Sequence, residues 1–291
     1  MPALTYEQYC EHYARQCDNC KGKRRYKIDG NWTACPCQQK AALKFRFESI
    51  PIQPEELKRL TWKDFTGRVP KKGSVISGNA YQSARKTLLG YCFNSNDEKA
   101  ILSNDFDVMQ ERRRLYSCVL DHLQDGQNLA IFGGSETGKS LLAMIVIKEV
   151  IYASLVFGRP NVSFRWTRGS ELLHAVTWDG EGKTVDEAFM WDLVATDYLV
   201  IDDVYLERKG HSRAPDVVEL DRLFSERMIR SRPTIIVGEP EIATCVLGNG
   251  GNDIMAKKNL RKTLIHSWGI SFFKLLSDKK TTLLHLEKGK G

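Results

Sequence analysis

Apolar positions in the second half of the chain form two kinds of pattern. Short apolar runs, which are typical of buried strands, lie within residues 128–132, 197–203 and 232–238, and residues 161–166 are a further predicted strand. Stretches with helical spacing follow these runs, at residues 141–151, 169–175, 184–193 and 217–229. Ser170 is the expected N-cap of the second helix. Strands that alternate with helices predict a parallel sheet with helices on both faces, and therefore an α/β fold.

The first half of the chain is organised differently. Its first 48 residues are polar and rich in cysteine, and residues 38–47 within them predict a short basic helix that ends before Pro51. Further helices are predicted at residues 79–91 and 108–125. We therefore expect three parts, which are a module at 1–48, a linker with helical segments at 49–126, and an α/β domain at 127–291.

One glycine-rich turn links the first predicted strand to the helix that follows it. Residues 133–140 fit the phosphate-binding pattern G-x-x-x-x-G-K-[ST]. Its glycines let the backbone N–H groups point inward at phosphates, and the helix adds the positive end of its dipole. Lys139 is expected to reach the β- and γ-phosphates, and the Ser140 hydroxyl to bind Mg²⁺. The expected nucleotide-binding residues are Gly133, Gly134, Ser135, Glu136, Thr137, Gly138, Lys139 and Ser140.

Two acids end the predicted strand at 197–203. Asp202 follows an apolar run and is expected to hold Mg²⁺ beside Ser140. Asp203 is placed to orient and polarise an attacking water. Together with the phosphate-binding loop, this pair predicts a Mg²⁺-dependent ATPase or GTPase. The chain shows no N-K-x-D motif for reading guanine.

Five of the eight cysteines lie in the first 48 residues. The pairs Cys17–Cys20 and Cys35–Cys37 bracket a basic segment with a plausible hairpin turn at residues 29–31. Two close pairs around such a hairpin predict a structural, tetrahedral Zn²⁺ site, although C-x-C is tighter than the usual C-x-x-C. Cys10 and His12 are alternative ligands, and a set of free thiols is the alternative to a metal.

Charge and hydropathy bear on location and partners. The formal net charge of +7 fits a nucleic-acid partner without requiring one. Basic residues of the module form either a solvated face or a contact with nucleic acid or an acidic protein, and they include Lys21, Lys23, Arg24 and Arg25. No basic, apolar leader follows Met1, and no apolar run has the length of a membrane span. We expect a cytoplasmic protein without disulfides or membrane contact.

These motifs, in this order, resemble the AAA+ ATPases of the DnaC/DnaI-type replicative-helicase loaders and the related IstB-type transposition ATPases. The resemblance rests on the phosphate-binding loop, on the run Leu199–Asp203 and on the Arg-Pro-Thr sequence that begins at Arg232. It implies an AAA+ sheet of the additional-strand (ASCE) type. The chain departs from the family where a sensor Ser/Thr-Asn is expected, because Gly238 and Glu239 stand there. It also leaves little length after Leu276, which implies a short or absent helical lid.

The resemblance further implies ATP, Mg²⁺ and self-association into oligomers with ATP between subunits. An arginine from the neighbouring subunit would complete each site; Arg261 is the first candidate, followed by Arg227 and Arg230. The implied partners are a replicative helicase, held by the zinc module, and single-stranded DNA. One alternative is an IstB-like transposition regulator on duplex DNA. The other is a nucleotide-gated zinc adaptor with little hydrolysis.

Overall fold

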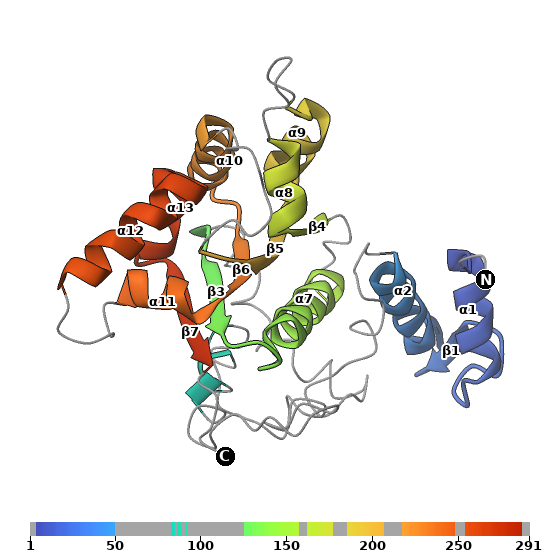
Figure 1. Cartoon of the computed structure of the whole chain (residues 1–291). Helices are drawn as coiled ribbons and strands as arrows, with labels where there is room; N and C mark the ends of the chain where they lie inside the picture. Colours follow the sequence, from blue (N-terminus) through green and yellow to red (C-terminus); the bar gives the residue numbers. More distant parts are fainter. Residues whose placement is uncertain are drawn as a thin grey trace.

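The computed structural model describes residues 4–49, 83–84, 86–88, 91, 125–156, 162–176, 185–206, 217–247 and 254–286. These residues form an α/β core and a small N-terminal module that lies against one side of it (Figure 1).

The core is built on a five-stranded parallel sheet with the order β4-β5-β6-β3-β7. Its strands are β3 (Asn128–Gly133), β4 (Phe164–Arg168), β5 (Tyr198–Val204), β6 (Thr234–Gly238) and β7 (Thr281–Leu286). The predicted strands are confirmed, although three of them begin one to three residues later than predicted. Strand β7 was not predicted, and it pairs along the whole length of β3.

Helices cover both faces of this sheet (Figure 1). They are α7 (Lys139–Val156), α8 (Gly169–Ala175), α9 (Glu187–Ala195), α10 (Val217–Ile229), α11 (Pro240–Leu247), α12 (Ile254–Trp268) and α13 (Ile270–Ser277). Alternate residues of the strands, such as Phe132 and Ile201, join one apolar cluster with α8 to α13. Because successive side chains of a strand point to opposite faces, the intervening residues face α7. The α/β fold class is confirmed.

The predicted start of α8 was wrong. Ser170 lies inside the helix, and Arg168 is the N-cap residue. The Glu171 carboxylate accepts a hydrogen bond from the Arg168 backbone N–H at 3.0 Å, which satisfies a donor at the helix start. A glutamate three residues after the cap was therefore the better signal than the serine.

The N-terminal module contains α1 (Tyr6–Arg15), β1 (Arg25–Ile28), β2 (Asn31–Ala34) and α2 (Pro36–Glu48). The predicted hairpin is confirmed, with β1 and β2 antiparallel and Asp29 and Gly30 in the left-handed region at φ 48° and 83°. The predicted basic helix is α2. Helix α1 was not predicted, although Thr5 and Gln8 form a capping box that marks its start.

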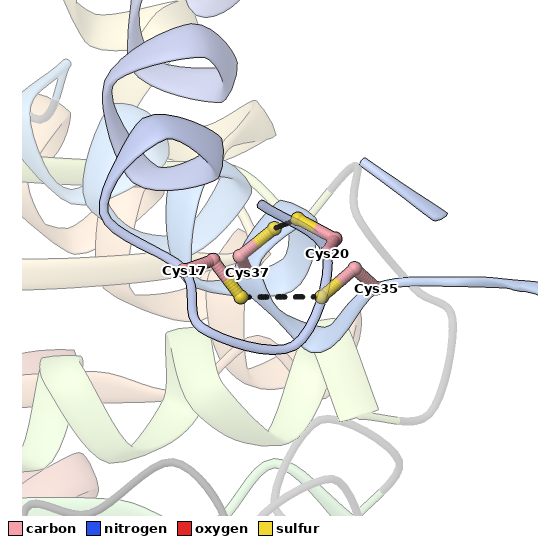
Figure 2. A group of neighbouring side chains, drawn as sticks. All are labelled: Cys17, Cys20, Cys35 and Cys37. Carbon is pink, nitrogen blue, oxygen red and sulfur yellow. Dashed lines mark hydrogen bonds between the residues drawn. The ribbon is translucent and has the colours of Figure 1, made fainter. Parts of the chain in front are cut away.

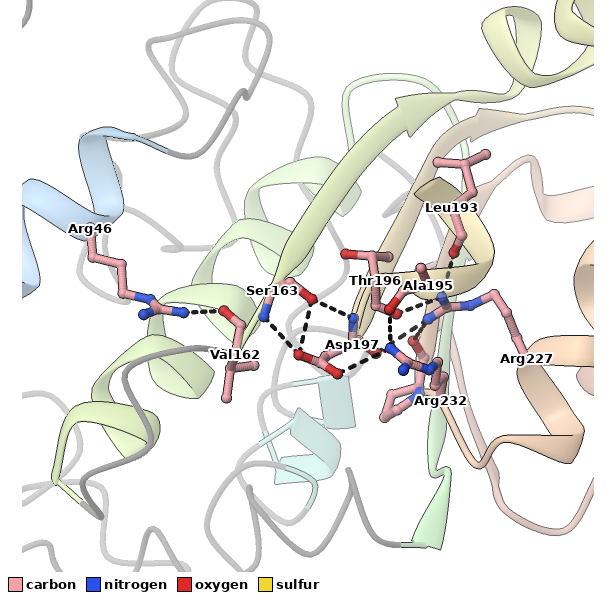
Figure 3. Close-up of polar contacts among 10 residues, drawn as sticks. Arg46, Val162, Ser163, Leu193, Ala195, Thr196, Asp197, Arg227 and Arg232 are labelled. Atoms are coloured by element: carbon pink, nitrogen blue, oxygen red, sulfur yellow. Dashed lines mark hydrogen bonds and ion pairs between the residues drawn. The ribbon is translucent and has the colours of Figure 1, made fainter. Parts of the chain in front are cut away.

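The module packs on the core through α2 and α7 (Figure 1). Arg46 of α2 donates a hydrogen bond to the Val162 carbonyl, just before β4 (Figure 3). Its guanidinium also lies 6.0 Å from the centroid of the Phe164 ring. A helix that is apolar on all sides must be covered on all sides. Helix α7 is apolar on nearly all sides, and it is covered by the sheet on one side and by α2 on another.

Most of the linker, including the predicted helix at 108–125, lies outside the described residues. The described positions within 79–91 are helical and bury Ala84, Leu88 and Tyr91, as the apolar spacing predicted. The Tyr91 hydroxyl donates to the Gln127 carbonyl at 3.1 Å, beside the start of β3. Among the described residues, no helix combines the length and apolar character of a membrane span.

Candidate functional site

The phosphate-binding loop lies where β3 ends and α7 begins, at the carboxyl edge of the parallel sheet. Glu136 and Gly138 take left-handed backbone conformations, with φ of 63° and 84°, and these turn the chain back toward the helix. The Thr137 hydroxyl and the Lys139 ammonium both donate to the Gly134 carbonyl, at 2.9 and 2.7 Å. The loop is thus closed on itself, as a cradle of backbone N–H groups requires.

The first glycine of the loop is required by packing. A Cβ at Gly133 would lie 2.7 Å from the Leu286 carbonyl oxygen and 2.9 Å from the Thr137 hydroxyl oxygen. Leu286 ends β7, so the last strand of the sheet supports the loop from one side. The sequence motif names this glycine, but only the pairing of β3 with β7 gives the reason for it.

The loop and the acidic pair meet across the sheet edge. The Ser140 hydroxyl donates to Asp202 Oδ1 at 3.0 Å, which joins residues that are 62 positions apart in the chain. Burial raises the pKa of the Asp202 carboxyl, and the Ser140 hydrogen bond opposes that rise. A hydroxyl and a carboxylate side by side are the oxygen ligands that Mg²⁺ prefers, so these residues fit the ion predicted for them.

Asp203 differs from its neighbour in conformation and exposure. Its φ is 59°, and it lies where the pairing of β5 with β6 shifts between Ile201 and Val204. Its backbone N–H donates to Asp202 Oδ1 at 2.9 Å, while its side chain is exposed. The irregularity separates the directions of the two acids, so that one carboxylate faces Ser140 and the other faces solvent.

The end of β6 carries the departure from the family pattern. A Cβ at Gly238 would lie 2.7 Å from the Val204 carbonyl, and that same carbonyl accepts from the Glu239 backbone N–H at 3.0 Å. The Glu239 carboxylate accepts from the Leu206 backbone N–H at 3.4 Å. Gly238 and Glu239 therefore hold the backbone that follows the acidic pair.

The structure is incompatible with Arg227 as an arginine supplied to a neighbouring subunit. Its side chain is 0% exposed, and its guanidinium donates to five oxygen atoms, including the carbonyls of Leu193 and Thr196 in Figure 3. They are the Thr234 hydroxyl and the carbonyls of Leu193, Thr196, Asp197 and Pro233. These contacts tie α10 to the starts of β5 and β6. Charged side chains are rarely buried unless they are fully partnered, and for that reason the sequence suggested a surface position.

The other two candidate arginines are exposed. Arg261 lies on α12, with its guanidinium 4.3 Å from the centroid of the Phe273 ring. Arg230 pairs with Glu226 at 3.1 Å and lies 5.3 Å from the Trp191 ring centroid. Both are accessible at the surface, and Arg261 lies nearer to its aromatic ring than Arg230 does.

The cysteine pairs meet at the base of the hairpin (Figure 2). The sulfur atoms of Cys17, Cys20, Cys35 and Cys37 all lie within 4.8 Å of one another, with Cys17–Cys35 at 3.4 Å and Cys20–Cys37 at 3.6 Å. Sulfurs at ~2.3 Å from a tetrahedral Zn²⁺ are separated by ~3.8 Å, whereas a disulfide needs ~2.05 Å. The spacing fits a metal site and excludes disulfides among these four residues.

The alternative ligands lie outside this cluster. Cys10 is buried on α1, and His12 is exposed on the same helix with its ring against Tyr13. Gln38, which sequence analysis did not single out, donates to the Cys37 sulfur at 3.3 Å and to the Cys10 carbonyl at 3.5 Å. An amide directly after the C-x-C pair was the available signal, because metal-bound thiolates are often hydrogen-bonded.

The thiol pKa values within the cluster diverge. Burial alone would raise the pKa of Cys17, but hydrogen bonds from the backbone N–H groups of Cys20 and Asn19 and from neighbouring thiols lower it to about 7. Burial raises the pKa of Cys35 and of Cys37. A buried thiolate is costly without a cation, and this is the electrostatic condition that a bound Zn²⁺ relieves.

No family model matches the chain, and no curated protein matches its sequence. Similar solved structures include one described as a primosome component from Streptococcus pyogenes serotype M3, at 12% identity over 86% of this chain and 97% of that chain, with a TM-score of 0.44. DnaI is 11% identical over 84% and 97% of the two chains, with a TM-score of 0.41. The DnaC helicase loader is 17% identical over 60% and 89%, with a TM-score of 0.35.

The fold is identified by the sheet itself. Strand β6 lies between the P-loop strand β3 and the acidic-pair strand β5, which is the additional-strand arrangement that the motifs implied. Ligands of parallel sheets bind at the carboxyl ends of the strands, where Ser140 and Asp202 meet. By its strand order, its P-loop and the acid that faces this loop, the chain has the AAA+ fold, and the solved structures similar to it include DnaI and the DnaC helicase loader.

Proposed function

We propose that this chain is an ATP-dependent, helicase-loader-like AAA+ ATPase that acts in the initiation of DNA replication. The observation that carries the proposal is the 3.0 Å contact between Ser140 of the P-loop and Asp202 of β5. This contact brings a magnesium-type ligand pair to the end of a phosphate-binding loop. Asp202 lies near the end of β5, and the loop that leads to Ser140 in α7 follows the buried strand β3.

The proposed chemistry uses the residues of this edge in separate roles. The N–H groups of the loop and Lys139 bind the phosphates, and Ser140 and Asp202 hold Mg²⁺, which neutralises charge on the phosphate oxygens when bound. Asp203 orients the attacking water and accepts its proton. The exposed side chain of Asp203, next to the half-buried Asp202 that faces Ser140, supports these separate roles.

We propose Arg261 as the arginine that a neighbouring subunit supplies to the γ-phosphate. Its exposure on α12 and its position over the Phe273 ring support this role, because a stacked guanidinium is held in place before it meets its ligand. The proposal implies that the chain self-associates when ATP is bound.

The zinc module is proposed to bind a replicative helicase, and the core to bind single-stranded DNA. The sequence resemblance and the net charge of +7 support these partners. In this proposal Zn²⁺ has a structural role, because the four cysteines already complete a tetrahedral set and leave no position for a substrate.

One observation favours a second function, a nucleotide-gated zinc adaptor with little hydrolysis. Glu239 stands at the sensor position, and its carboxylate is bonded to the Leu206 N–H in the loop after β5. An IstB-like regulator on duplex DNA is the remaining alternative.

ATP turnover by the full chain tests these functions, measured alone, with single-stranded DNA and with duplex DNA. We expect single strands to stimulate turnover, Lys139→Ala to abolish it, and Asp203→Asn to slow it by about a hundredfold while ATP still binds. Lys274→Ala, which changes an exposed lysine of α13, is the matched control. Stimulation only by duplex DNA would favour the transposition regulator, and ATP binding without turnover would favour the adaptor.

A further inference from the structure

The hairpin of the N-terminal module exposes an aromatic side chain beside a cation. Trp32 of β2 is 59% exposed, and the Lys27 ammonium of β1 lies 5.4 Å from the centroid of its ring. A large aromatic side chain therefore lies in solvent, on a hairpin whose other residues are also almost all exposed.

The strand register explains why Trp32 points outward. Lys27 pairs with Trp32 and Arg25 pairs with Ala34, so these side chains share one face of the hairpin. Tyr26 pairs with Thr33 on the opposite face, and Tyr26 packs against the cysteine cluster. We call the first face, with Arg25, Lys27 and Trp32, the outer face. The cysteine cluster lies beneath the other face, so the outer one is left to solvent.

The charge around the outer face is strongly positive. The segment from residue 21 to residue 34 carries five cations, Lys21, Lys23, Arg24, Arg25 and Lys27, and one acid, Asp29. Glu7 and Glu11 of α1 pair with Arg24. The side chains of the other four cations are exposed, and two of them flank Trp32 on the same face.

A second exposed tryptophan offers a comparison within the same molecule. Trp191 of α9 is 57% exposed and has the Arg230 guanidinium 5.3 Å from its ring centroid. There, however, Arg230 is also paired with Glu226 at 3.1 Å, and the next residue, Asp192, is paired with Arg165 at 2.9 Å. The same aromatic–cation pair therefore stands in a region of balanced charge, which does not attract a polyanion.

We propose that the outer face binds a single-stranded nucleic acid, with a base stacked on the Trp32 indole and with Arg25 and Lys27 against its phosphates. Exposed aromatic rings between cations are how proteins hold unpaired bases, whereas the bases of a duplex are already stacked on one another. An acidic protein segment would satisfy the cations but has no base to cover the ring. The site is separate from the P-loop and does not rest on the proposed ATPase function.

The cysteine cluster fixes the backbone of the hairpin before a nucleic acid binds to it. A two-stranded hairpin is marginally stable alone, but here Cys20 precedes β1 and Cys35 follows β2, so the cysteine cluster closes the open end of the hairpin. The Cys35 N–H also donates to the Arg24 carbonyl at 2.9 Å. A base that binds Trp32 thus meets a surface whose backbone is already fixed, and less entropy is lost on binding.

Binding of labelled oligothymidylate, about 15 nucleotides long, to the full chain tests the proposal by fluorescence anisotropy. The measurement is made without nucleotide in a Lys139→Ala background, so that ATP-dependent binding by the core does not contribute. We expect Trp32→Ala to weaken binding by about tenfold or more, and Trp32→Phe, which keeps a ring, to retain most of it. Trp191→Ala is the matched control and should change binding by less than about twofold. Oligouridylate of the same length shows whether the site distinguishes RNA from DNA.

The salt dependence tests the phosphate contacts separately. Each lost contact with a single strand lowers the slope of log K against log salt by about 0.7, so we expect this change in Lys27→Ala and no change in Arg230→Ala. Unaltered binding by Trp32→Ala would overturn the proposal. It would also be overturned if polyglutamate displaced the oligonucleotide with equal efficiency, because the face would then be one for acidic protein segments.

Discussion

The P-loop of the core and the hairpin of the module each contain a tight turn of the backbone, but different interactions stabilise the two regions. The P-loop follows β3, all of whose residues are buried, and it is supported by β7 and by α7. The cysteine cluster supports a hairpin with almost no buried side chains, and the small apolar group around it is Ala14 and the four cysteines, with Tyr13 and Tyr26 at its edge.

The difference follows from size. A domain of a hundred residues or more buries enough apolar surface to fix a loop by packing, whereas a unit of about fifty residues is marginal and commonly needs a metal or disulfides. Four sulfurs within 4.8 Å of one another supply that stabilisation to the module when Zn²⁺ binds. Packing therefore holds the site of the core, and we expect coordination to hold the module.

The largest effect is expected from loss of a cysteine ligand. Cys37→Ser should release the metal and unfold the module, because structural Zn²⁺ contributes on the order of 10 kcal/mol to the folding of such units. Elemental analysis and amide hydrogen exchange measure both consequences, and exchange in β3 and β5 should stay slow. Cys10→Ala, a buried cysteine outside the cluster, should keep the metal. If the Cys37→Ser module stayed folded without metal, then metal coordination would not be what stabilises the module.

Loss of the buried Arg227 should destabilise the core and leave the module folded, which is the reverse of the effect expected for Cys37→Ser. Arg227→Met leaves four carbonyls, three of them in buried hydrogen bonds, and the Thr234 hydroxyl without their donor, and we expect the core to lose about 3–5 kcal/mol of unfolding free energy. Arg227→Lys should rescue little, since an ammonium cannot reach all five acceptors.

Chemical denaturation of the core measures this loss, and Arg230→Ala, which changes an exposed arginine directly after α10, is the control with an effect under about 0.5 kcal/mol. Equal effects of the two variants would contradict the structural role of Arg227. The metal content should remain unchanged in both.

The smallest effect is expected at the contact between the module and the core. Arg46→Ala removes the hydrogen bond to the Val162 carbonyl and the contact with the Phe164 ring, and we expect docking of the module to weaken by about 1 kcal/mol. Faster proteolysis between the module and the core would report it, with both parts still folded. Arg15→Ala, which removes an exposed ion pair within the module, should leave the cleavage rate unchanged. A rate unaffected by Arg46→Ala would show that α2 and α7 hold this contact without it.

Local patterns predicted much of this molecule. The spacing of apolar residues located β3 to β6 and the helices α7 to α10, because the buried faces of strands and helices must be apolar, but α11 to α13 were not among the predicted helices. Strand β7 was missed because its polar threonines and histidine weaken the apolar signal, and its position beside β3 comes from pairing with residues about 150 positions earlier. Helix α1 is short and polar, and only its capping box distinguished it.

The sequence by itself determined the features whose residues are contiguous or closely spaced. These features are the P-loop motif, the acids at the end of an apolar run, the Asp-Gly turn and the cysteine pairs. Each is a local conformation or a local set of ligands, so its residues are close together in the sequence. The structure then brought Ser140 to Asp202 and the two cysteine pairs to each other, as their chemistry required.

Only the tertiary structure decided which side chains the rest of the chain surrounds. Arg227 and Arg261 look alike in the sequence, yet one lies 0% exposed among five oxygen atoms and the other stands on the surface. Trp32 is aromatic like Trp268, yet Trp268 lies in the core and Trp32 faces solvent. Burial depends on what packs against a residue from distant parts of the chain, and composition or spacing around the residue does not contain that information.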